Sequence, residues 1–101
     1  MLFTFNDRTY ILQFDYVNYQ NSDERVTCAE FYYRQEGTQE KVVLGYGSSY
    51  CSPNDNFVKS IGRKLAIKRL LENIQDNGFF IDGLKEFRTQ FWRQYFMQVK
   101  Y

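Results

Sequence analysis

The spacing of apolar residues changes halfway along this chain, from alternation to helical spacing. Before residue 52 the pattern alternates, so that Tyr10, Leu12, Phe14 and Tyr16 fall on one face of an extended segment. Alternation of this kind is typical of a strand with one buried face. After residue 52, apolar residues recur every three or four positions, which indicates amphipathic helices. The order of the two patterns predicts strands first and helices second.

Three long strands are predicted, over residues 9–19, 26–35 and 41–50, and Leu2–Phe5 is a candidate for a fourth, short one. Gly37 lies between the last two strands and can supply the positive φ of a two-residue type II′ turn with Thr38. Strands followed by helices favour an α+β fold. We therefore expect a three- or four-stranded antiparallel sheet followed by two α-helices packed on one face. The whole chain, residues 1–101, is expected to form a single domain.

The turn at Gly37 also predicts a strand register. Three pairs then share a face directed at the core, namely Tyr33 with Val42, Phe31 with Leu44, and Ala29 with Tyr46. The first long strand joins this core if Phe14 lies opposite Phe31 and Leu12 opposite Tyr33. The other, wetter face is expected to carry the pairs Arg34 with Lys41 and Tyr32 with Val43, together with Gly45 and Gly47.

The first helix is predicted over residues 53–77, with Ser52 as its cap. Ser52-Pro53-Asn54-Asp55 has the pattern of a capping box, and Gly78 is a stop with Ile74 and Phe79 placed for a Schellman motif. Gly62 in the middle of this helix costs about 1 kcal/mol relative to alanine, so we expect another backbone to approach it closely. The second helix is predicted over about residues 82–99. Its apolar face consists of Leu84, Phe87, Phe91, Trp92, Tyr95 and Val99.

The chain contains no histidine, which removes Ser-His-Asp triads, Cys-His pairs and histidine-containing zinc sites. Cys28 and Cys51 alone cannot complete a zinc site, and the predicted register separates them too far for a disulfide. The carboxylates are scattered and form no predicted acid–base pair. We therefore expect no enzyme activity, no metal and no cofactor. The absence of a signal peptide and of a long apolar run predicts a cytoplasmic protein without a membrane partner.

The formal net charge of +1 hides an uneven distribution. Residues 1–52 hold four basic and seven acidic residues, whereas residues 53–101 hold nine basic and five acidic ones. The candidate contact residues are five cations without an intervening acid, Lys59, Arg63, Lys64, Lys68 and Arg69, together with Tyr32 on the sheet. Helical spacing puts the cations on several sides of the helix, whereas a helix that binds in a groove would align them on one side. They are either contacts for nucleic acid or an acidic protein, or solvated helix faces.

Cys51-Ser52-Pro53-Asn54-Asp55-Asn56-Phe57 is followed by Lys59, Gly62-Arg63, Ala66 and Arg69. This C-x-P-x-D-x-F…G-R-x-x-A-x-x-R pattern resembles a signature of small proteins from tailed phages and prophages. The resemblance covers about a quarter of the chain. It implies a protein that binds and blocks a host protein, for example a defence nuclease or a polymerase, or one that binds nucleic acid.

Our leading hypothesis is a small, non-catalytic, phage-type binding protein that inhibits or modulates a host protein, as anti-CRISPR and other anti-defence or host-takeover proteins do. The alternative is a nucleic-acid-binding module that uses Lys59–Arg69. A third hypothesis is a homodimer joined through an apolar side of the first helix or through the sheet edge.

Overall fold

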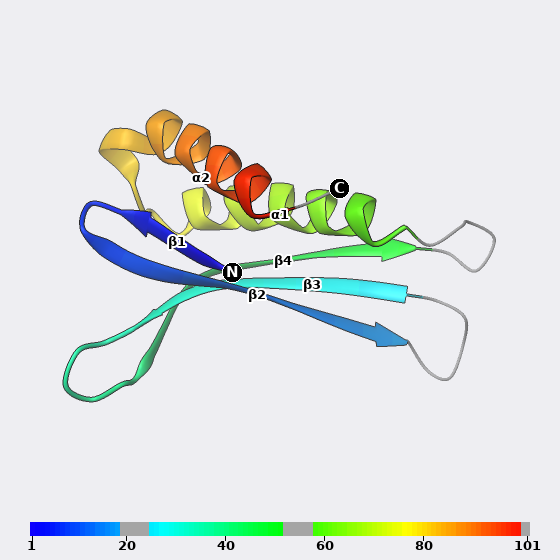
Figure 1. Cartoon of the computed structure of the whole chain (residues 1–101), viewed down its shortest axis with the longest axis horizontal. Coiled ribbons are helices and arrows are strands. Elements are labelled where there is room, and N and C mark those ends of the chain that lie inside the picture. Colours follow the sequence, from blue (N-terminus) through cyan, green and yellow to red (C-terminus); the bar gives the residue numbers. More distant parts are fainter. Residues whose placement is uncertain (19–24, 52–57, 100–101) are drawn as a thin grey trace.

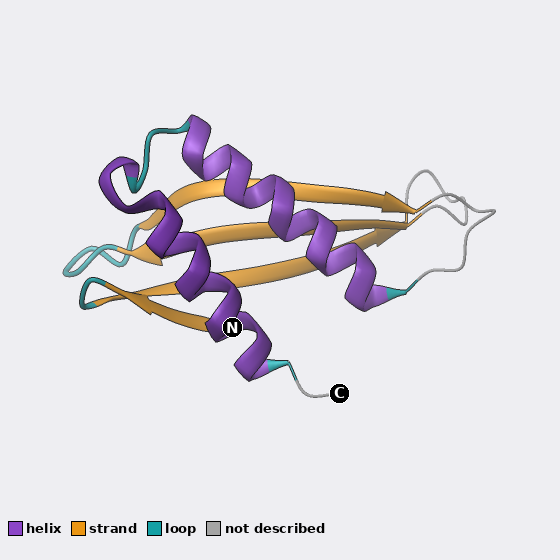
Figure 2. Cartoon of the chain, turned by 90° about the horizontal axis from the view of Figure 1, so that it is seen from above, coloured by secondary structure: helices purple, strands orange, loops and turns teal. Residues whose placement is uncertain are grey.

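The computed structural model describes residues 1–18, 25–51 and 58–99. Four strands form one antiparallel sheet in sequence order: β1 (Leu2–Phe5), β2 (Arg8–Asn18), β3 (Arg25–Arg34) and β4 (Lys41–Cys51). They are followed by α1 (Lys59–Asp76), the short 3-10 helix η2 (Ile81–Gly83) and α2 (Leu84–Gln98). Both α-helices lie on the same face of the sheet, α1 over β3 and β4 and α2 over β1 (Figures 1 and 2). The predicted α+β fold is confirmed, including the candidate fourth strand.

Aromatic rings fill the core between the sheet and the helices. Phe31 is completely buried at its centre and makes edge contacts with Phe3 and Phe91, whose own rings stack with centroids 4.6 Å apart. Tyr10 stacks on the other side of Phe31 at 5.1 Å. Such ring pairs add about 0.5–1.5 kcal/mol each beyond the area they bury. The aromatic content of the chain is thus used largely inside the fold.

A β-bulge in β4 corrects the predicted register. Val42 and Val43 pair with Tyr33 and Tyr32 as predicted, but beyond them Phe31 lies opposite Gly45. Leu44 is the extra residue, and it stays buried in the core. The predicted pairs of Phe31 with Leu44 and of Ala29 with Tyr46 are therefore wrong.

The bulge turns Gly45 and Gly47 toward α1 and Tyr46 away from it. A Cβ on Gly47 would lie 2.0 Å from the carbonyl oxygen of Ala66, so only glycine allows the helix to pack this closely. Without the bulge, Tyr46 would point into α1. The prediction that the two glycines lie on the wetter face fails for this reason.

Two other turn and register predictions also differ. Arg34 pairs with Lys41 as predicted, but a wider loop replaces the predicted two-residue turn at Gly37-Thr38. In this loop the Gln35 amide donates to the Glu40 carbonyl, and the Gln39 amide donates to the Gln35 carbonyl. Gln39 as well as Gly37 has positive φ. On β2, the register is shifted by two residues, which keeps each side chain on its face. It places the Phe14 ring opposite the small Ala29 and not opposite Phe31.

Helix α1 begins at Lys59, after Val58 in an extended conformation, so it is shorter than predicted. The predicted capping box at residues 52–55 lies outside the described residues. The C-terminal prediction is confirmed: Gly78 has a φ of +82°, and the amides of Gly78 and Phe79 donate to the carbonyls of Gln75 and Ile74 in a Schellman motif. Over the described ranges, neither helix is both long and apolar enough to cross a bilayer.

Gly62 is approached by side chains of the sheet and not, as predicted, by another backbone. A Cβ there would lie 2.8 Å from Oγ1 of Thr27, and Ser49 Oγ donates a 2.7 Å hydrogen bond to the Gly62 carbonyl. The close backbone approach occurs one turn further along α1, at Ala66.

Side chains from α1 cover the outer edge of β4. Asn77 Nδ2 donates to the Leu44 carbonyl at 2.9 Å, the Tyr46 amide donates to Asn73 Oδ1 at 2.9 Å, and Arg69 Nη1 donates to the Ser48 carbonyl at 2.6 Å. The three helical residues are four positions apart, so they lie on one side of α1. They satisfy edge groups that the sheet leaves unpaired.

The opposite edge is covered in the same way by α2. The side-chain amide of Gln94 accepts from the Thr4 amide and donates to the Thr4 carbonyl, both at 2.9 Å. Gln98 Nε2 donates to the Leu2 carbonyl at 2.8 Å. Both edges of the sheet are therefore paired with helix side chains.

Candidate partner-binding surfaces

The five cations singled out in the sequence lie on different sides of α1. Lys59 and Arg63 lie over β2, where Lys59 Nζ is 4.9 Å from the centroid of the Tyr16 ring and Arg63 Nε donates to Tyr16 Oη at 2.5 Å. Arg63 also lies 5.8 Å from the ring of Phe14. This pair of cations is held against aromatic rings, which restricts its side-chain freedom.

Arg69 lies on the β4 side, where its bond to Ser48 gives it a structural role. Lys64 and Lys68 are exposed on the outer side of α1. The expectation that the cations do not form one stripe is therefore confirmed.

One exposed row of α1 combines cations with apolar residues. Ile61, Lys64, Leu65 and Lys68 follow each other at helical spacing, and Lys64 Nζ lies 5.6 Å from the ring centroid of Phe96 on α2. We call these five residues the helical stripe. Its apolar members are well exposed, Ile61 by 58%, Leu65 by 43% and Phe96 by 44%.

The antiparallel helices concentrate positive charge around this stripe. The first half of α1 lies nearest the last turns of α2, as the contact between Lys64 and Phe96 shows (Figure 2). Among the acidic residues of the helical layer, Glu72 lies one turn beyond Lys68, and Asp76, Asp82 and Glu86 lie at the other end or in the connection. The sequence prediction missed the contribution of α2, which has Arg93 and no acid after Glu86.

Next to the stripe is a small hollow between the helices. It has a volume of about 150 Å³ and is lined by Lys68, Leu71, Glu72, Arg88 and Trp92. A cavity of this size admits a group about as large as benzene. The hollow can therefore receive one apolar side chain.

Tyr32, the candidate contact on the sheet, is only 6% exposed. Lys41 Nζ lies 4.4 Å from its ring centroid, Arg34 lies at 5.6 Å, and Tyr32 Oη donates to Gln13 Oε1 at 3.3 Å. Its ring is thus covered within the chain, and a partner would meet Arg34 and Lys41 first.

Within residues 1–18, 25–51 and 58–99, no helix lies on the sheet face opposite α1 and α2 (Figure 1). The strand registers place on it seven apolar or aromatic residues, Ile11, Val17, Val26, Tyr32, Val43, Tyr46 and Tyr50, and four charged ones, Asp15, Glu30, Arg34 and Lys41. We call this surface the open face. Lys41 and Glu30 form an ion pair, and the hydrogen bond that Lys41 donates to Glu30 raises the pKa of Lys41. Tyr46 is 59% and Tyr50 55% exposed.

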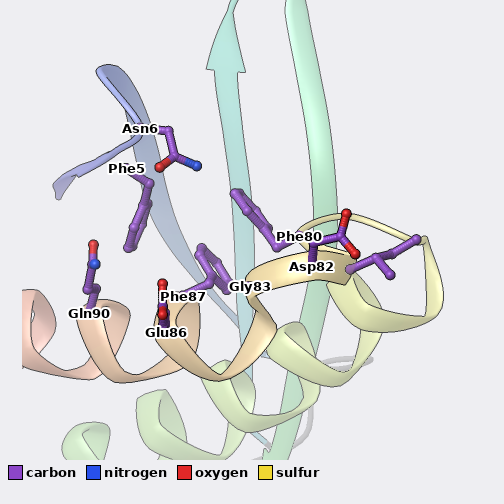
Figure 3. A pocket seen from close by; sticks show the side chains of 9 residues that line it. Phe5, Asn6, Phe80, Asp82, Gly83, Glu86, Phe87 and Gln90 are labelled. Atoms are coloured by element: carbon purple, nitrogen blue, oxygen red, sulfur yellow. The ribbon is translucent and has the colours of Figure 1, made fainter.

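A hollow of about 430 Å³ lies where the β1–β2 turn meets η2 and α2 (Figure 3). Phe5, Phe80 and Phe87 form its apolar wall, with Asp82 and Glu86 beside them. Phe80 and Phe87 stack at 4.0 Å, and Phe80 has a positive φ of 59°. Sequence reasoning missed this hollow, because it forms between Phe5 and Phe80, which are 75 residues apart in the sequence.

Two further features of the described part of the chain concern metal ligands and cysteine pairing. No three acidic, cysteine or histidine side chains there lie close enough together to hold a metal ion. Cys28 and Cys51 are both partly buried and are not joined by a disulfide, as predicted. Cys28 pairs with Ser48, and Cys51 lies three ladder positions away.

No known protein family matches this chain, and no curated protein or solved structure is significantly similar to it. The resemblance to phage proteins stays a prediction, and the surfaces described above carry the functional argument.

Proposed function

We propose that this chain is a small, non-catalytic binding protein of the phage type, which docks on a host protein through the helical stripe and thereby inhibits or modulates it. The observation that carries this proposal is the mixture of exposed apolar residues and cations at helical spacing. Aromatic residues such as Phe96 are enriched at protein interfaces, and the exposed Ile61 and Leu65 add apolar area beside it. A partner surface that is acidic and partly apolar complements this arrangement.

The apolar members of the stripe favour a protein over nucleic acid. Phosphate contacts need cations, and base contacts need rings or polar groups. Ile61 and Leu65 supply neither, yet they are exposed next to Lys64. The hollow at Trp92 gives an apolar side chain of a partner a place to insert.

Site-specific photo-crosslinking in bacterial cells tests this proposal. A photoreactive residue at position 65 is expected to give one adduct of defined mass that survives nuclease digestion. The same residue at Glu36, exposed in the β3–β4 loop, is the control and should not give that adduct. The adduct should be lost when Lys64→Glu and Lys68→Glu are added. An adduct that appears equally at both positions, or that nuclease removes, contradicts the proposal.

Nucleic-acid binding is the second candidate, and one observation favours it. Lys59 and Arg63 flank the ring of Tyr16, which is partly exposed, and a ring between two cations suits a stacked base and its phosphates. Single-stranded DNA should then bind with salt-dependent affinity. Lys59→Gln with Arg63→Gln should reduce the slope of log K against log salt by about 1.4. Fluorescence anisotropy measures this slope, and affinity that does not change with salt contradicts this candidate.

A further inference from the structure

The open face is the part of the sheet that the fold leaves available for association. Strand addition at β4 has to displace Asn73, Asn77 and Arg69, and strand addition at β1 has to displace Gln94 and Gln98. Edge-to-edge pairing, one of the routes to a homodimer expected from the sequence, is therefore disfavoured. Among the described residues, no helix side chain covers the broad open face in this way (Figure 1).

We propose that a second copy of this chain packs on the open face, sheet against sheet. Antiparallel sheets with helices on one side usually expose a polar surface on the other. Here the open face carries Val17, Val26 and Tyr50 at one end and Tyr46 and Val43 further along it. Paired sheets lie about 10 Å apart with their strands about 30° from parallel, a geometry that twisted strands can adopt.

The charges of the open face are complementary to a second copy in one orientation. Its two acids and two bases cancel, so two such faces do not repel each other. Asp15 on β2 lies opposite Cys28 of β3. Arg34 lies six residues further along β3, at the end that leads into the β3–β4 loop. A two-fold axis that reverses the strands brings Arg34 of one copy to Asp15 of the other. Within one chain these two side chains are about 20 Å apart along the strand.

The area of the open face suits a weak dimer. β2, β3 and β4 have 11, 10 and 11 residues. They span about 34 Å by about 14 Å, so two fully overlapping faces enclose about 1,000 Å², and the offset of about 10 Å that brings Arg34 to Asp15 leaves about 700 Å². Stable dimers bury more than this, and weak or transient contacts lie in this range. The dimer is therefore expected to form and dissociate with protein concentration.

This dimer is independent of the proposed function, because it leaves the helical layers of both copies on the outside. Each copy then presents its own helical stripe, and the dimer can hold a multivalent partner with increased avidity. Variants of the stripe should lose the partner and keep the dimer, so that failure of either proposal is recognised separately.

Analytical ultracentrifugation over a wide concentration range tests the dimer. The wild-type chain should pass from the mass of one copy to that of two as concentration rises. Tyr46→Lys should shift this transition to at least about tenfold higher concentration, because it places an added cation in each half of the interface. Ile61→Lys, on the helical stripe, is the matched control and should leave the transition unchanged.

Charge exchange tests the orientation. Asp15→Arg and Arg34→Asp should each weaken the dimer, because each variant puts like charges opposite one another. The double variant should restore it, and circular dichroism checks that each variant is folded. A chain that remains monomeric at every concentration contradicts the proposal and leaves the open face to a different protein. If the wild-type chain dimerises and the double variant does not, the antiparallel orientation is contradicted.

Discussion

Gly47 of β4 lies against the backbone of Ala66 in α1, so closely that a Cβ on Gly47 would be 2.0 Å from the Ala66 carbonyl oxygen and 2.4 Å from the Leu70 nitrogen. Neither of these backbone atoms can rotate away. The contact sets the distance between the helical layer and the sheet. It also explains why β4 contains a bulge, since the bulge turns this glycine toward the helix.

Gly47→Ala should therefore lower the free energy of unfolding by about 3 kcal/mol, because α1 has to move away from β4. Thermal or urea denaturation followed by circular dichroism measures this loss. Gly83→Ala is the control, because nothing lies within 4 Å of a Cβ there and φ is −160°. An unchanged stability of Gly47→Ala would show that the packing of α1 on the sheet is wrong.

Gln94→Ala should destabilise the fold by about 1–2 kcal/mol. The substitution removes two hydrogen bonds to Thr4 and leaves an edge amide and carbonyl of β1 without their partner. Gln90→Ala, one turn earlier on α2 and exposed, is the matched control and should cost less than about 0.5 kcal/mol. Equal effects of both substitutions on urea denaturation would argue against the edge contact.

The fold should lose stability in alkaline solution, and Tyr10 should contribute to that loss. Burial raises the pKa of Tyr10 above its ordinary value of 10.0, although Arg8 opposes the shift. The folded state thus holds the phenol proton more tightly, so this stability is present below about pH 10 and is lost as pH rises through the raised pKa. The raised pKa of Lys41 has the same sign, because its ion pair with Glu30 is lost on deprotonation.

Tyr10→Phe should reduce the fall in melting temperature between about pH 8 and about pH 11. Tyr46→Phe is the control, because Tyr46 is exposed on the open face. Tyr10→Phe should still lose some stability at high pH, because Lys41 still loses its proton in this variant. If the melting temperature of Tyr10→Phe falls as steeply with pH as that of the wild type, Tyr10 does not contribute to the loss of stability.

Local patterns predicted the elements well, because each depends on few residues. The Schellman motif needs a glycine after the helix, and Gly78 provides it. The alternation in β2 and β3 needs one buried face, which Tyr10, Leu12 and Phe31 define. These features are determined within about ten residues of sequence.

Long-range packing determined the features that the sequence did not reveal. The bulge at Leu44 depends on how closely α1 approaches Gly45 and Gly47, which no local pattern in β4 encodes. The helical stripe depends on α2 bringing Phe96 to Lys64, 32 residues apart in sequence. The cations of α1 were recognisable, but the exposure of Ile61 and Leu65 between them required the fold.

If the helical stripe binds a protein, the partner identified by crosslinking should bind the Leu65→Ser variant less tightly than the wild type. Truncating an interface anchor should weaken binding at least about tenfold, equivalent to about 1.4 kcal/mol. Tyr46→Lys, on the open face, should bind a single partner molecule as the wild type does. Calorimetric titration that gives Leu65→Ser the wild-type affinity would contradict the account.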